Sequence, residues 1–200
     1  IINHEFKLVY YHEGFNQASL ETEINLALCL LPETKPLIIT EIMQNPFAVP
    51  DENGEWFEIY NISGTPIDLL NWSITDAGDD NHIIQSSLVI APEQYIVLGN
   101  NSNYSMNGGV TVDYEYVDYS LGNSSDEIIL VDPFGTLTDS VAWDNGATFP
   151  DPNGASMALL DQLFDNSIGA NWVESTLPYG DGDLGTPGLP NFYPVIEVEV

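Results

Sequence analysis

The stretch GEWFEIYNISGTPIDLLNWSITD, residues 54–76, decides the fold class. It contains three short runs rich in aromatic and β-branched residues, at 55–61, 66–70 and 72–76. The intervening ISGTP carries a glycine and a proline, which favour a tight turn. Short runs of β-forming residues that are separated by turn residues are typical of antiparallel strands. This region therefore predicts consecutive β-strands.

The same alternation of strands and turns extends along the chain in both directions. Further strands are predicted at residues 37–43, 94–99, 110–117, 127–132, 136–143 and 155–161. Turn signals recur at intervals of roughly ten residues, a spacing typical of a β-sandwich or barrel. The tight turn DPFG, residues 132–135, predicts a hairpin of the strands that flank it. No stretch shows a sustained helical period, and we expect an all-β fold.

Five blocks of sequence, taken in order, resemble one known family. They are LIITEIMQNP (37–46), the opening stretch (54–76), SLVIAPEQYIVLGNN (87–101), SLGNSSDEIILVDPFGTLTDSVAW (120–143) and GDGDLGTPGLPN (180–191). Together they resemble the lamin-tail domain, in its prokaryotic secreted form, over residues 37–191. The resemblance implies an Ig-like antiparallel β-sandwich with Trp56, Phe57 and Ile59 on an early strand, Leu69 and Trp72 pointing inward, and GTPGLPN as the closing turn. In prokaryotic relatives this domain accompanies secreted nucleases, phosphoesterases or surface proteins, and is itself considered non-catalytic.

Two flanking segments do not follow the rhythm of the sandwich. We expect an N-terminal extension over residues 1–36 with strands at 5–13 and 23–31, and an alternating C-terminal strand within 192–200. In VIEVEV, residues 195–200, Ile196, Val198 and Val200 fall on one face of a strand and the two glutamates on the other. A lone strand is stable only on an available sheet edge. That edge belongs either to the same chain or to a neighbouring subunit, and the second alternative predicts self-association.

The charge balance restricts the partners. The formal net charge is -29, Lys7 and Lys35 are the only lysines, and there is no arginine. Such a chain has almost nothing with which to neutralise nucleic-acid phosphates, and anionic membrane surfaces repel it. No apolar run reaches membrane-spanning length. Because carboxylates without basic partners repel one another, we expect cations as partners and Ca²⁺ as a ligand.

Three acidic loops offer the oxygens that calcium prefers; one is PDENGE, residues 50–55, and the other two carry the candidate ligands. In DAGDDN the candidate ligands are Asp76, Asp79 and Asp80, and in DGD they are Asp181 and Asp183. The alternative is that Asp and Gly simply form good turns. For the DGD loop, the resemblance favours a domain-closing turn, with ion binding as an addition.

A catalytic set is not found in the sequence. His4, His12 and His82 stand in no metal-binding array, and Cys29 has no neighbouring base. Glu55 and Glu58 flank an aromatic strand, where an exposed edge is a better interpretation than a glycosidase pair. We expect no enzymatic activity.

Five Asn-X-Ser/Thr sequons exceed the chance expectation and favour an extracellular or cell-surface location. They lie at Asn61, Asn71, Asn100, Asn103 and Asn123. The predicted function is a non-catalytic extracellular structural or adhesive module, such as a self-assembling subunit of a surface layer or filament. The alternative is a calcium-dependent accessory module of a larger secreted hydrolase, which anchors it to polysaccharide or a surface. In that case Tyr114, Tyr116 and Tyr119 are candidates for a sugar-binding face, although an ordinary half-buried strand explains them as well.

Overall fold

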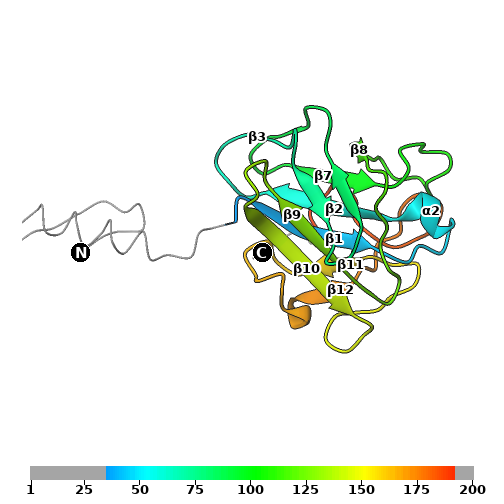
Figure 1. Ribbon diagram of the computed structural model, residues 1–200. Helices are drawn as coiled ribbons and strands as arrows, with labels where there is room; N and C mark the ends of the chain where they lie inside the picture. Colours follow the sequence, from blue (N-terminus) through cyan, green and yellow to red (C-terminus); the bar gives the residue numbers. More distant parts are fainter. Residues whose placement is uncertain (1–34, 192–200) are drawn as a thin grey trace, which may run out of the picture. The chain divides into compact units, whose positions relative to one another are not determined.

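Two β-sheets pack against each other across one apolar core (Figure 1). The structure, a computed structural model, describes residues 35–191. The six-stranded sheet has the order β12-β11-β1-β2-β7-β8 and the four-stranded sheet the order β10-β9-β4-β5. All neighbouring strands are antiparallel except β7 and β8. The described residues thus form an all-β, Ig-like sandwich.

The elements follow one another closely along the chain. The strands of the larger sheet are β1 (Leu37–Met43), β2 (Trp56–Asn61), β7 (Tyr95–Gly99), β8 (Tyr114–Glu115), β11 (Met157–Leu159) and β12 (Trp172–Glu174). Those of the smaller sheet are β4 (Ser73–Thr75), β5 (Asn81–Ile83), β9 (Ser125–Val131) and β10 (Leu137–Asp144). A separate ribbon pairs β3 (Ile67–Asp68) with β6 (Val89–Ile90), and the helical turns are α2 (Asp51–Gly54) and η1 (Gly169–Asn171). No helix within residues 35–191 is long and apolar enough to cross a membrane.

The core contains Leu69 and Trp72, the two side chains that the resemblance placed inward. Phe57, Leu69, Trp72, Ile96, Leu130 and Trp143 all belong to one buried cluster. Trp56 points to the other face of the sheet, into a smaller cluster with Met43, Val97 and Val110. Adjacent residues of a strand point to opposite faces, and here both faces are covered. This explains why β1 and β2 are buried along their whole length.

The strand predictions are confirmed where local patterns are strong. β1 has the predicted bounds, and β9 and β10 form the predicted hairpin around the turn at 132–135. The predicted strand at 110–117 is wrong in extent, because only Tyr114 and Glu115 pair with β7. Tyr116 and Tyr119 instead turn into the main core. The strands expected at 5–13, 23–31 and 195–200 lie outside the described residues.

Candidate functional site

Three carboxylates converge at one end of the four-stranded sheet. Asp76 follows β4, and Asp126 and Glu127 lie at the start of β9, which pairs with β4. One oxygen from each lies within 4.8 Å of the others. Oxygen ligands of Ca²⁺ lie at about 2.3–2.6 Å from the ion, so oxygens at this spacing can share one cation. No other group of this kind was found among residues 35–191.

Backbone donors order this cluster. Asp76 accepts hydrogen bonds from the amides of Gly78 (2.9 Å) and Asp80 (3.1 Å), which shapes the β4–β5 turn. Glu127 accepts one from the amide of Ala77, and Asp126 accepts one from Gly122 at 2.6 Å. Burial raises the pKa of Asp126, and the nearby charges of Glu127 and Asp76 add to this rise. A bound divalent cation would relieve that repulsion.

The predicted calcium ligands of DAGDDN separate in the structure. Only Asp76 belongs to the converging group. Asp80 accepts hydrogen bonds from the backbone and hydroxyl of Ser120, and Asp79 is exposed. Asp126 and Glu127 were not predicted as ligands, because only the pairing of β9 with β4 brings them to Asp76. The sequence feature that could have indicated them is the pair of adjacent carboxylates at the start of β9.

A second set of acidic side chains is buried within the six-stranded sheet. Glu41 of β1 and Glu58 of β2 are paired across the strands, and both are fully buried. Glu41 accepts hydrogen bonds from Ser156, Ser175 and the backbone and hydroxyl of Thr186. Glu58 accepts them from the hydroxyl of Thr40 (2.7 Å) and the amide of Gly188 (2.8 Å). Both carboxyls therefore hold the segment 184–191 onto the sheet.

The expectation of an exposed edge at Glu55 and Glu58 is wrong. Glu58 is covered by the segment around Gly188, and Glu55 accepts hydrogen bonds from Asn100 and from the amide of Leu121. Burial raises the pKa of Glu58 well above its ordinary value, and the charge of Glu41 adds to the effect. Burial likewise raises the pKa of Glu41, against the hydrogen bonds that it accepts. For Glu55, burial is the main cause of a pKa of about 8.

The comparison with known families agrees with this architecture. The model of one family, the Lamin Tail Domain, matches residues 32–145, which is more than half of the chain. The chain belongs to the lamin-tail domain family. Lamin tail domains are non-enzymatic Ig-like modules, which fits a non-enzymatic role for this one. No curated protein matches the chain.

This lamin tail domain extends beyond the matched region. β11 and β12 continue the sheet of β1, and residues 184–191 cover Glu41 and Glu58. Gly180 lies against Gly108, where an added Cβ would stand 1.8 Å from the carbonyl oxygen, so only glycine fits. The stretch 179–191 therefore closes the domain, as the resemblance implied.

Asp183 has a structural task in this closure. Its side chain is buried, and its oxygens accept hydrogen bonds at 3.0–3.2 Å from the amides of Phe47 and Ala48. Asp181, two residues earlier, is exposed. The two predicted ligands of DGD thus face different surroundings, and neither joins the converging carboxylates.

The sequons of the lamin tail domain are not equivalent. Asn61 is fully buried and its amide nitrogen donates to the carbonyls of Thr65 and Ile90 (2.9 Å each). A glycan on Asn61 is incompatible with this arrangement, so the structure does not support Asn61 as a glycosylation site. The side chains of Asn100 and Asn123 are half-buried and donate to neighbouring oxygens. Asn71 and Asn103 are exposed.

The described histidine has a packing role. His82 is buried, and its ring nitrogens lie 3.0 Å from the carbonyl of Val117 and 2.9 Å from the hydroxyl of Tyr114. Both ring nitrogens of His82 therefore have a partner within the domain. His4, His12 and Cys29 lie outside the described residues.

Proposed function

We propose that this lamin tail domain is a non-catalytic structural or adhesive module at the cell surface or outside the cell. Its copies associate by addition of a strand to an exposed sheet edge. The observation that carries the proposal is the outer edge of β10. This edge belongs to the longest strand within residues 35–191, which has eight residues.

β10 pairs with β9 on one side only. Among residues 35–191, no backbone group forms a hydrogen bond with the outer edge of β10 from Ser140 to Trp143. Near its start, the strand is protected by a bulge and by the buried Asp139, whose side chain contacts Lys35 and Asn166. Bulges and inward-pointing charges are common devices against unwanted pairing. The part from Ser140 onward lacks them and offers free donors and acceptors to a partner strand.

The segment 195–200 has the pattern that such an edge requires. Its apolar face would continue the inward row of Val141 and Trp143, which are buried. Its glutamates would continue the outward row that includes the exposed Ala142. Strand addition of this kind is heterologous, so it propagates into a filament or layer unless it closes into a ring.

Sedimentation of the full chain at several concentrations and salt levels tests the proposal. We expect assemblies in the wild type and their loss when residues 195–200 are deleted or when Ile196 and Val198 are both changed to Glu. The matched control, Glu197→Gln with Glu199→Gln, keeps the apolar face and should still assemble. A wild type that is monomeric under all conditions, or assembly that persists in the deletion, would contradict strand addition.

Charge at the receiving edge supplies an independent test. Ala142→Glu should weaken association, because like charges on neighbouring strands repel, and Ala142→Lys should strengthen it. Equal effects of the two variants would show that β10 is not the receiving edge.

A second candidate function is a calcium-dependent accessory module of a larger secreted hydrolase. The convergence of Asp76, Asp126 and Glu127 favours it. The buried Tyr116 and Tyr119 do not favour a sugar-binding face at that position. Calorimetric titration with CaCl₂ at fixed ionic strength tests the ion site: Asp126→Asn should abolish the binding heat, whereas the exposed Asp181→Asn should preserve it. Absence of binding heat in the wild type would remove calcium from the proposal.

A further inference from the structure

Among residues 35–191, nothing covers one part of the outer sheet face beside the closing segment. Across this face the strand registers place Glu58, Glu41, Ala158 and Val173 in one row, from β2 to the edge strand β12. Thr186 and Gly188 cover the two glutamates. The uncovered end of the row is a groove of about 540 Å³ beside β12.

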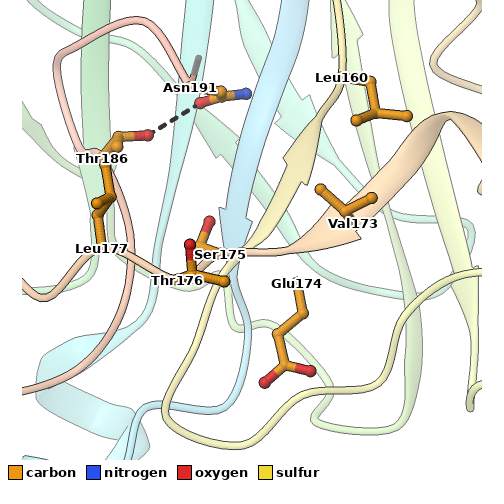
Figure 2. A pocket seen from close by; sticks show the side chains of 8 residues that line it. All are labelled: Leu160, Val173, Glu174, Ser175, Thr176, Leu177, Thr186 and Asn191. Atoms are coloured by element: carbon orange, nitrogen blue, oxygen red, sulfur yellow. Dashed lines mark hydrogen bonds between the residues drawn. The ribbon is translucent and has the colours of Figure 1, made fainter. Parts of the chain in front are cut away.

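The walls of this groove are mostly apolar. Figure 2 shows Leu160 and Val173 on one side and Leu177 with Thr186 on the other, with Asn191 between them at one end. Leu160 and Leu177 are 38% and 47% exposed. An apolar recess lined by exposed leucines favours an apolar occupant.

Asn191 brings the chain to the rim of this groove. Its amide nitrogen donates to the carbonyls of Thr40 (2.8 Å) and Leu159 (3.0 Å), and its oxygen accepts from the hydroxyl of Thr186 (3.1 Å). The next residues in the sequence are Phe192, Tyr193 and Pro194. Consecutive Cα atoms are about 3.8 Å apart, so both aromatic residues start within reach of the groove.

The amino-acid composition favours residues 192–194 over residues 195–200 as the occupant of the groove; residues 192–200 together are called the C-terminal tail below. The groove contains Glu174 and no basic side chain, so the carboxylates of Glu197 and Glu199 gain nothing there. Phenylalanine and tyrosine each remove a large apolar surface from water when they are buried. Pro194 also restricts Tyr193 to extended conformations, which lowers the entropic cost of holding it.

We propose that the groove between Leu160, Val173 and Leu177 binds Phe192 and Tyr193 of the same chain. This anchor holds the start of the tail against the edge strand β12 and defines the point from which residues 195–200 depart. It does not depend on strand addition at β10, because an anchored aromatic pair is compatible with a tail that pairs with its own or another chain.

Cysteine cross-linking of the full chain tests the anchor. In a Cys29→Ser background, Leu177→Cys combined with Pro194→Cys keeps both aromatic residues and should form a disulfide within one chain on mild oxidation, with loss of both free thiols. Leu160→Cys with Pro194→Cys is a second pair across the groove, should the first variant fold poorly. Ile83→Cys with Pro194→Cys is the control, because β5 is the far edge strand of the opposite sheet, and it should not cross-link within the chain.

Two results would overturn the proposal. Cross-linked dimers in place of cross-linked monomers would assign the groove to the tail of a second copy. Groove pairs that cross-link no faster than the control pair would show that the aromatic residues lie elsewhere. As a second measurement, Phe192→Ala with Tyr193→Ala should lower the melting temperature, whereas Phe134→Ala, which removes a side chain that is 93% exposed, should not.

Discussion

Glu41 and Glu58 lie directly opposite each other on β1 and β2, and both side chains are completely buried. Like charges at directly opposed positions of a sheet destabilise it. Burial raises the pKa of both carboxyls, and the charge of Glu41 adds to the rise at Glu58. Hydrogen bonds join both carboxyls to the closing segment: Glu41 accepts one from the amide of Thr186, and Glu58 accepts one from the amide of Gly188. The end of the domain is thereby attached to its first two strands.

The raised carboxyl pKa values predict a stability that falls with rising pH. The folded protein keeps protons that the unfolded chain releases near the ordinary pKa of 4.5. For Glu55, stability should therefore be greatest below 4.5 and should fall until the pH passes about 8. One such group contributes at most about 1.4 kcal/mol per pH unit to the slope of the unfolding free energy.

Denaturant unfolding across this pH range checks the prediction. Glu55→Gln, which imitates the protonated acid, should have a shallower slope than the wild type. Glu52→Gln, at an exposed position, controls for the change in net charge and should keep the wild-type slope. A slope that is the same in all three proteins would contradict the assignment to Glu55.

Removal of the Asp183 carboxylate should loosen the closing turn. Asp183→Ala leaves the amides of Phe47 and Ala48 without their acceptor. Hydrogen bonds to a charged group contribute about 1.5–3 kcal/mol each, so we expect the loss of two of them to lower the unfolding free energy by about 3–6 kcal/mol. Asp181→Ala, on the exposed neighbour, should change it by less than about 0.5 kcal/mol. Equal losses in the two variants would mean that Asp183 does not hold the turn.

Truncation in the core should have the largest effect. Trp72 is 8% exposed and belongs to the main buried cluster. Trp72→Ala should cost about 3–5 kcal/mol, because it removes apolar contacts and leaves a cavity. Phe134→Ala is the matched aromatic truncation at the surface and should leave the unfolding free energy nearly unchanged. A mild effect of Trp72→Ala would place this side chain outside the core.

Salt should stabilise the domain. With a formal net charge of -29, repulsion between carboxylates opposes the compact state. The Debye length falls from about 10 Å at 0.1 M to about 3 Å at 1 M, so added salt screens this repulsion. Melting temperatures in NaCl, with a chelator present to remove divalent ions, should rise with ionic strength. A flat response would mean that surface repulsion has little effect on stability.

Local sequence patterns were sufficient to predict much of the fold. Alternation and turn residues predicted β1 and the β9–β10 hairpin, and the resemblance placed Leu69 and Trp72 inward, where the structure has them. These predictions succeed because strand periodicity and turn preference are local properties of the chain. The resemblance in five ordered blocks predicted the family, and the family match confirms it.

The acidic residues show what only the tertiary structure decided. Glu58 looked exposed from its neighbours, but its cover comes from Gly188, which is 130 residues away in the sequence. Asp76 meets Asp126 and Glu127 only because β4 pairs with β9. Burial and electrostatic coupling depend on which segments meet in space, and no local pattern contains that information. The sequence by itself determined that this protein is an acidic β-sandwich, whereas long-range pairing decided which carboxylates are buried, which converge and which remain in water.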